Sequence, residues 1–539
     1  PFAHNQHHHR CYRDKATERN MLIGYSGIQL LDLETHESST NQWVRGICQY
    51  GIMNANGYIY VPPDTCQCYS SVRVNGFFTL AERNSMDDIR IAPVVEKGPA
   101  FGKSSQTAIG DPQSGDWPTY RGNIARSGAT GSKVTEKLTT KWEAAIGHGI
   151  TAPVVAGGKV YVAQKDAYTV HCLDRTNGKP LWKFFANGPI DSPPTIHPSG
   201  LCLVGCGDGS VYCLDADSGE LAWRFKVSAL ERRIGSENRL ESPLSISGSV
   251  LVLDDVVYFA AGRSTNLDGG IRLYGLDVRT GKQLYSRVLA SGYWAQGDDS
   301  AIAAPPTTGK RVSPTGALVD ILVSNGQTIA MRQVRLDKTL TKGGGGTLLS
   351  SSKGLLDDTW FHRQSWKVQN TTGQLIVFDD NASYSVTNPY SRLKFQRKAQ
   401  YQKYKQDGHL HQKFTRYEES FFPIGSTISA KSSDARRESP GSSWSINEPF
   451  QPRAMVLAGD NLFLAGWLDA LAIQLKTGRA LSDDNPDPHE SVLRVYSAKS
   501  GDRLAEHQLE SDPVFDGAAT AYSHLFISLK NGKLLCLGE

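Results

Sequence analysis

Two stretches of the chain, LDRTNGKPLWKF (173–184) and LDADSGELAWRF (214–225), repeat one arrangement of residues. Each has an apolar run, a polar turn with one glycine, and a second run that carries aromatic residues. The turn glycines, Gly178 and Gly219, lie 41 residues apart. Glycine supplies the positive φ that such tight turns require, so each copy predicts two strands joined by a hairpin. Further copies follow at LDVRTGKQLYSR (276–287), YSAKSGDRLAEH (496–507) and LKNGKLLCLGE (529–539).

A second pair of strands precedes several of these copies. GITAPVVAGGKVYVAQ (149–164) has two β-branched runs around a Gly-Gly turn, and 241–262, 452–467 and 513–532 are similar. Four short strands in about 40 residues are typical of a propeller blade. The sequence therefore predicts an all-β fold, a single β-propeller of about eight four-stranded blades.

The length of 539 residues fits one such ring with long loops. We expect one propeller domain over 1–539, closed by its two termini, because closure removes exposed sheet edges. Insertions are expected at 86–136, 338–356 and 391–445, where the repeat is interrupted. No stretch has the ~20 apolar residues of a membrane helix. The net charge of +4, from 58 basic and 54 acidic residues, is too balanced to indicate a nucleic-acid partner.

DWPTYRGNIARSG (116–128), followed by these LDxxTGxxLW-like turns, resembles the PQQ-like (quinoprotein-type) β-propeller repeats of bacterial envelope proteins. RCYRDKATERN, WVRGICQYGIMNANGYIYVPPDTCQC and GLLDDTWFHRQSW resemble an uncharacterised propeller subfamily of Planctomycetes-type bacteria. The resemblance implies a propeller in the periplasm or outside the cell. It brings no established activity. The chain begins PFAHNQHHHR, and we expect a mature form from which a signal peptide has been removed.

Features of true quinoprotein alcohol dehydrogenases are missing from the sequence. Those enzymes carry a disulfide between adjacent cysteines and a tryptophan docking motif in every blade. Here no Cys-Cys pair occurs, and Trp stands in only two clear copies, at Trp182 and Trp223. CxxCH, GxGxxG and Walker motifs are absent too. We therefore do not expect PQQ as a cofactor.

The nine cysteines form two groups. Five fall in or beside predicted strands, where a buried thiol acts as a small apolar side chain: Cys172, Cys202, Cys206, Cys213 and Cys536. The other four lie close together in non-repeating sequence: Cys11, Cys48, Cys66 and Cys68. Two disulfides, free thiols or a structural metal ion would each fit this second group. Disulfides are favoured over a metal because CQC is not the CxxC spacing of zinc sites.

Polar residues stand at or near the start of several predicted innermost strands. They are His148, Asp191, Glu241, Arg453 and Asp516. Innermost strands line the channel of a propeller, so these side chains are predicted to converge at its mouth and bind substrate. The alternative is that they pair with one another or with channel water.

The segment LDDTWFHRQSW (356–366) concentrates groups that suit an acidic sugar. Trp360 offers a stacking platform, and Asp358 a hydrogen-bond acceptor. His362 is a candidate general base, and Arg363 a candidate for neutralising a uronate. Tyr384 and Tyr390 are candidate general acids. The alternative is an aromatic strand packed at a blade edge.

A basic, aromatic run at 392–416 adds a further place for an anionic polymer, or else a solvated loop. The first functional hypothesis is therefore a polysaccharide lyase acting on an acidic or sulfated polysaccharide. The second is a non-catalytic propeller that binds a protein or a glycan. A quinoprotein dehydrogenase is the least favoured of the three.

Overall fold

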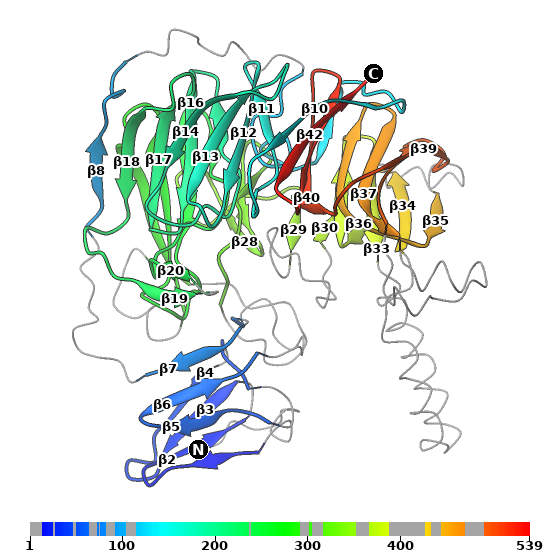
Figure 1. The fold of residues 1–539 in the computed structure, drawn as a ribbon. Coiled ribbons are helices and arrows are strands. Elements are labelled where there is room, and N and C mark those ends of the chain that lie inside the picture. Colours follow the sequence, from blue (N-terminus) through cyan, green and yellow to red (C-terminus); the bar gives the residue numbers. More distant parts are fainter. Residues whose placement is uncertain are drawn as a thin grey trace, which may run out of the picture.

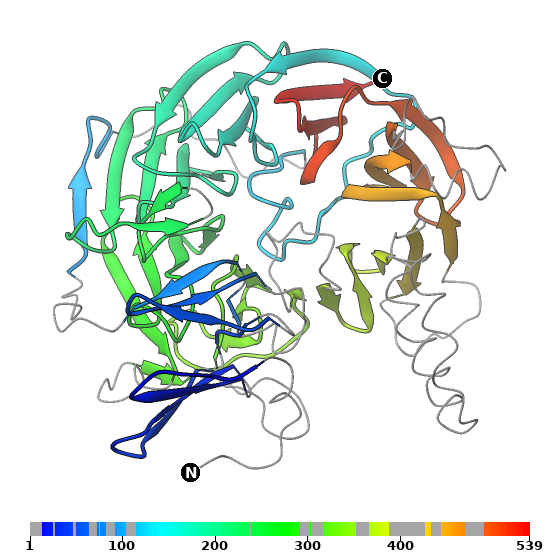
Figure 2. The same cartoon turned by 60° about the horizontal axis from the view of Figure 1, so that its bottom comes forward.

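The computed structural model describes residues 13–24, 27–41, 43–46, 50–63, 73–74, 76–81, 92–103, 115–236, 239–291, 301–303, 316–351, 366–387, 426–432, 444–468 and 490–539. The described residues form strands and turns with no helix, arranged in eleven sheets. No helix long and apolar enough to cross a membrane occurs among them. Eight of the sheets follow one another around a ring (Figures 1 and 2), so the predicted all-β propeller is confirmed.

The first four ring sheets follow the chain order, and we number them sheet 1 to sheet 4. Sheet 1 is β11 (Val154–Ala156), β12 (Lys159–Gln164), β13 (Thr169–Asp174) and β14 (Pro180–Phe185). Sheet 2 is β15 (Thr195–His197), β16 (Leu201–Cys206), β17 (Ser210–Asp215), β18 (Leu221–Lys226) and β8 (Val94–Lys97). Sheet 3 is β21 (Leu251–Leu253), β22 (Val256–Ala261), β23 (Ile271–Asp277), β24 (Gln283–Ala290) and β25 (Ala301–Ala303). Sheet 4 is β26 (Val323–Ser324), β27 (Ile329–Met331) and β28 (Val334–Leu336).

The remaining ring sheets are sheet 5 to sheet 8. Sheet 5 is β29 (Ser350–Ser351), β30 (Trp366–Val368) and β31 (Thr371–Gly373). Sheet 6 is β32 (Leu375–Phe378), β33 (Ala382–Thr387), β34 (Ser426–Ser432) and β35 (Ser445–Glu448). Sheet 7 is β36 (Phe450–Ala458), β37 (Asn461–Leu468), β38 (Ser491–Ser497), β39 (Arg503–Gln508) and β9 (Ala129–Thr130). Sheet 8 is β40 (Pro513–Ala521), β41 (His524–Leu529), β42 (Lys533–Gly538) and β10 (Thr139–Ala145).

The ring is closed in sheet 8, where β10 pairs antiparallel with β42 from the C-terminus. The strand that completes this sheet therefore comes from 139–145. Sheets 4 and 5 have three described strands each, and residues beside them lie outside the described part of the chain. The expected number of about eight blades accordingly stays a prediction.

Three further sheets are separate from the eight. A hairpin of β19 (Ile234–Ser236) and β20 (Arg239–Glu241) stands at one end of the ring. Two sheets hold the N-terminal strands, which are β1 (Lys15–Ala16), β2 (Asn20–Ile23), β3 (Ile28–Asp32), β4 (Ser38–Asn41), β5 (Met53–Ala55), β6 (Tyr58–Val61) and β7 (Phe78–Leu80). They bury a small core of their own and are drawn outside the ring in Figure 1. One domain over 1–539 stays a prediction, and none of these N-terminal strands pairs with a ring strand among the described residues.

Tryptophans join neighbouring ring sheets. The indole nitrogen of Trp182, in β14, donates to the carbonyl of Ala216 in the next sheet at 3.1 Å. Its ring covers Gly219, which has φ 75°, and a Cβ added there would lie 2.6 Å from the ring. This contact explains why the repeat requires glycine in its turn. The same arrangement joins Trp142 to Gly178, Trp223 to Gly281 and Trp444 to Gly501.

The expectation of only two such tryptophans is therefore wrong, because Trp142 and Trp444 serve the same role. The sequence did not reveal either residue, because neither lies in a copy of the repeat. Trp142 lies in β10, far along the chain from the other strands of sheet 8, and Trp444 lies just before β35. The five cysteines predicted to be core thiols are confirmed as buried and free. Cys11, Cys48, Cys66 and Cys68 lie outside the described residues, so their state stays a prediction.

The expected insertions contain ring strands. Residues 94–97 add a fifth strand to sheet 2, and 350–351 begin sheet 5. β34 pairs with β33 over residues 427–432 although it lies within 391–445. Its sequence STISAKS alternates buried and exposed positions but carries mostly small polar side chains, which conceal the strand pattern.

Candidate functional site: a filled channel and its mouth

Residues 115–130, which we call the hub segment, cross the middle of the ring (Figure 2). Their backbone bonds to ring sheets on all sides. Trp117 exchanges two hydrogen bonds with Val155 in sheet 1, at 2.7 and 2.9 Å. Similar bonds join Pro118 to Ile196, Ile124 to Ser324, Ser127 to Phe378, Gly128 to Leu457 and Gly115 to Tyr522. The hub segment therefore satisfies its backbone groups through the ring and fills this part of the channel.

Arg126 is fully buried in the hub segment and has no carboxylate partner. Its five N–H donors are matched by five oxygens at 2.5–3.4 Å. These belong to the hydroxyl of Thr119 and to the carbonyls of Tyr120, Leu322, Ser249 and Val250. Burial lowers the pKa of the Arg126 guanidinium to about 9, so it is still charged at neutral pH. Carbonyl dipoles from the segments that lead into sheets 3 and 4 thus solvate the charge.

Arg121 forms the second buried cation. Its Nη1 lies 2.7 Å from Oδ2 of Asp516, and Tyr120 donates its hydroxyl proton to the same oxygen at 2.7 Å. The Nη2 group donates to the carbonyl of Ile376, and the guanidinium lies 4.7 Å from the centre of the Trp366 ring. Burial, with the nearby Asp516 carboxylate, raises the pKa of Tyr120 well above its ordinary value. When the side-chain contacts of Arg121 and Arg126 are added to its backbone hydrogen bonds, the hub segment contacts all eight ring sheets.

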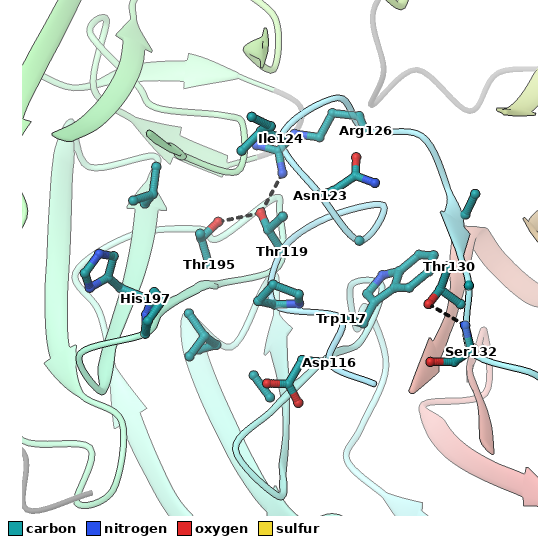
Figure 3. A pocket seen from close by; sticks show the side chains of 18 of the residues that line it. Asp116, Trp117, Thr119, Asn123, Ile124, Arg126, Thr130, Ser132, Thr195 and His197 are labelled. Carbon is teal, nitrogen blue, oxygen red and sulfur yellow. Dashed lines mark hydrogen bonds between the residues drawn. The ribbon is translucent and has the colours of Figure 1, made fainter. Parts of the chain in front are cut away.

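The hub segment and sheets 1 to 3 also form the walls of a cavity of about 880 Å³ (Figure 3). Apolar side chains dominate its lining: Trp117, Ile124, Ile196, Leu251 and Val252. Asp116 and His197 are two titratable groups in this lining. His197 is held by Asp255 at 2.9 Å and by Ser199 at 2.7 Å. Burial lowers the pKa of His197 in spite of Asp255, and burial raises that of Asp116.

The predicted channel residues lie at the opposite end, where the inner strands begin. Asp191 and Glu241 are brought together by Arg239, whose guanidinium lies 3.0 and 3.1 Å from them. A third carboxylate, Asp166, is 3.3 Å away. This acidic cluster is therefore a set of mutual ion pairs, as the alternative interpretation expected. Glu241 is buried, while Asp166 remains exposed.

Beside it lies a second group, Arg453, Trp467, Phe515 and Lys530, which we call the mouth patch. The guanidinium of Arg453 lies 5.6 Å from the Trp467 ring centre and 5.8 Å from that of Phe515. The ammonium of Lys530 lies 5.8 Å from the Trp467 ring. All four side chains are partly or fully exposed. His148 joins this side of the mouth, because its Nδ1 is 3.2 Å from the carbonyl oxygen of Lys530.

Other predicted site residues have different positions. Asp516 is 4% exposed and holds the hub segment, which differs from the expected role in substrate binding. Tyr384 is buried in the core of sheets 6 and 7 against Trp444, and burial raises its pKa to about 12. Its surroundings favour packing over proton donation. His362, Arg363, Trp360, Asp358 and Tyr390 lie outside the described residues, so their roles stay predictions.

Sequence analysis did not single out Tyr120, Arg121 and Arg126, or Trp467 and Lys530. A signal for the hub segment was present in DWPTYRGNIARSG, where two arginines and two glycines follow a Trp-Pro pair without strand alternation. The mouth patch had no local signal. Trp467 and Lys530 lie in different sheets and meet only through the curvature of the ring.

Comparisons with known proteins agree with the repeat. Residues 121–351 match the family model described as "Outer membrane protein assembly factor BamB". The protein of that name from Burkholderia pseudomallei is 30% identical over 132 residues, which cover 24% of this chain and 32% of that protein. The "Putative dehydrogenase XoxF" of Paracoccus denitrificans is 27% identical over 182 residues, covering 31% of this chain and 27% of that protein. The chain thus matches about a third or less of each relative's length.

A solved structure also matches: the quinohemoprotein alcohol dehydrogenase ADHIIG from Pseudomonas putida HK5. It is 12% identical, with a TM-score of 0.44, over 79% of this chain and 80% of that one. The resemblance to PQQ-like propeller repeats is confirmed, with residues 121–351 matched by the family model. The Planctomycetes-type subfamily stays a prediction.

The cavity can be tested against PQQ, which is a tricarboxylate. Arg126 and Lys133 are the cations that line it, and Arg126 already uses all five of its donors. Nowhere in the described part of the chain do three or more His, Cys, Asp or Glu side chains form a cluster suited to a metal ion. The described residues of the cavity therefore do not fit this quinone, and we assign no quinone-dependent step to it.

Proposed function

We propose that this chain is an extracytoplasmic propeller that binds an anionic polysaccharide at the mouth patch. The observation that carries the proposal is the pair of cations, Arg453 and Lys530, gathered around the partly exposed ring of Trp467. The location is supported by the matched relative named as an outer membrane protein assembly factor.

The chemistry of the patch suits a charged sugar better than a neutral one. An aromatic face stacks on the apolar face of a pyranose ring, as Trp467 can do from its exposed side. A guanidinium binds a carboxylate or a sulfate through two parallel hydrogen bonds, and an ammonium adds a point charge. Asp166, in the neighbouring acidic cluster, is exposed and offers acceptors for sugar hydroxyls.

Lyase chemistry is the second candidate, and the sequence cluster at 356–366 is what favours it. In β-elimination, a base removes the proton at C5 of a uronate, and an acid protonates the leaving oxygen at C4 as the C4–O bond breaks. The product carries a C4–C5 double bond. His362 is the proposed base, Arg363 neutralises the carboxylate, and Tyr390 is the proposed acid. The burial of Tyr384 favours Tyr390 over it.

Binding is tested by affinity electrophoresis in gels that contain polygalacturonate, chondroitin sulfate or neutral dextran. We expect retardation by the acidic polymers alone, and a loss of at least about 10-fold in affinity for Trp467→Ala and Lys530→Ala. Lys133→Ala is the matched control, because it removes an exposed lysine at the other end of the ring. Equal migration in all three gels, or unchanged retardation of Trp467→Ala, would contradict the proposal.

Catalysis is tested separately. Ultraviolet absorbance of the unsaturated uronate should rise during incubation with a uronate polymer and should not rise with His362→Ala. Binding without any such product would contradict the lyase hypothesis and would support a non-catalytic propeller that binds glycans.

A further inference from the structure

The hub segment has the properties of a bound peptide more than those of a propeller strand. It pairs with ring strands at two places only, a short parallel contact of residues 129–130 with β36 and a single antiparallel bridge from Trp117 to Val155 in β11. Its other backbone contacts with the surrounding sheets are single hydrogen bonds. We propose that the ring encloses a peptide-binding site in its channel and that residues 115–130 are its tethered ligand.

Recognition rests on the two guanidinium groups. Arg126 reaches carbonyl oxygens just before sheet 3 and sheet 4, at Ser249, Val250 and Leu322. Arg121 reaches Asp516 in sheet 8 and the carbonyl of Ile376 in sheet 6. These oxygens come from segments distant in the sequence, so only a closed ring presents them together. The site therefore selects a peptide with two arginines that point to opposite sides of the channel.

Shape is selected as well as charge. Arg121 and Arg126 have φ of 58° and 53°, a left-handed conformation that is unfavourable for residues other than glycine. The backbone bends twice within six residues, and Arg121 also donates to the carbonyl of Arg126 at 2.8 Å. A free peptide would not hold this form, so the ring imposes it.

On each side of the segment there is an exposed turn with a glycine, and space is open around that glycine. A Cβ added at Gly102 or at Gly131 would meet no atom within 4 Å. The chain can therefore be cut at both places without disturbing a packed residue. Cleavage would leave the ring strands of 139–539 continuous and would leave 1–102 attached through β8.

The test uses the full chain with a specific protease site inserted at Gly102 and another at Gly131. After both are cut, we expect the piece that carries the hub segment to remain with the ring in gel filtration. In the Arg126→Ala variant the piece should dissociate, with affinity lower by about 100-fold or more, because five buried oxygens lose their charged donor. Lys103→Ala is the matched control: it removes one positive charge from the same piece, at an exposed position.

A second measurement adds a fluorescent synthetic peptide of residues 115–130. Fluorescence anisotropy should rise with doubly cut protein whose own piece has been washed out in mild denaturant, and should not rise with uncut protein. Release of the wild-type piece as soon as both turns are cut, or precipitation of the cut ring, would overturn the proposal. So would equal retention of the Arg126→Ala piece. Dimers that form only after cutting would show that a second copy donates the segment, which supports the same site.

Discussion

Two sets of arginines in the ring differ in the surroundings that they meet. Arg121 and Arg126 in the hub segment are buried, and their guanidinium groups contact protein oxygens and, for Arg121, the Trp366 ring. Arg453 at the mouth is partly exposed and lies against aromatic rings. The first set is enclosed by the ring from all sides, while the second has one side open to a ligand.

This difference separates stability from recognition. A buried cation whose donors are all used contributes to folding but offers nothing to an external ligand. A cation that lies against an aromatic face at the surface can attract an anionic group from solvent and costs little to expose. The two ends of the channel therefore have distinct tasks although both are rich in arginine.

The largest expected effect comes from breaking the buried pair. Arg121→Ala leaves the carboxylate of Asp516 buried without its cation, which should lower the free energy of unfolding by about 3–5 kcal/mol. Arg453→Ala should lower it by about 1 kcal/mol or less. Chemical denaturation followed by tryptophan fluorescence measures both. Equal losses in the two variants would remove the distinction between hub and mouth.

The contact between ring sheets is the next test, with two glycines as a matched pair. Gly219 and Gly158 have nearly the same φ, 75° and 74°, but only Gly219 is covered by a tryptophan ring. Gly158→Ala should cost about 1 kcal/mol for the left-handed backbone alone. Gly219→Ala should cost about 3 kcal/mol, because the methyl group also displaces Trp182. Thermal unfolding measures the difference, and equal costs would show that the Trp182 contact does not join the sheets.

A smaller effect should appear with pH. His171 is 4% exposed in β13, and burial, with a contribution from Lys183, lowers its pKa from 6.5 to about 4. Between these values the unfolded chain binds a proton that the folded chain excludes, so stability falls as pH decreases from about 6.5 to 4. The loss should reach about 2 kcal/mol at pH 5 and level off at about 3 kcal/mol below pH 4 from this group. Denaturation at several pH values should show a flatter profile for His171→Asn, and an unchanged slope would contradict this assignment.

Prediction from the sequence succeeded where the structure is periodic. The repeated LDxxTG turn defines sheets 1 to 3 and the end of sheet 7, because strand alternation and a turn glycine are local properties. The repeat is not visible in the sequence of sheets 4 to 6, because their strands are short or carry Ser and Thr, as β34 does. The hub segment has no alternation at all. Its conformation depends on oxygens from every side of the ring, which no local pattern encodes.

The candidate site shows the same limit at the level of single residues. Asp191 and Glu241 were expected at the mouth, and they meet there through Arg239, which lies with Glu241 in β20 of the separate β19–β20 hairpin. Asp516 lies in an inner strand, as expected. Its side chain is buried, however, because the hub segment, about 390 residues earlier in the chain, packs against it.

The smallest expected change in stability is the one that matters most for function. The Lys530 side chain is 49% exposed, and its ion pair with Asp512 is 3.5 Å long, so Lys530→Ala should change the free energy of unfolding by less than about 0.5 kcal/mol. Binding of an acidic polysaccharide should nevertheless weaken, and its dependence on salt should become shallower, because one cation fewer contacts the polymer. Titrations at two salt concentrations measure this. If Lys530→Ala binds with the wild-type affinity and salt dependence, the mouth patch is a packing feature like the hub, and the contrast between the two ends of the channel fails.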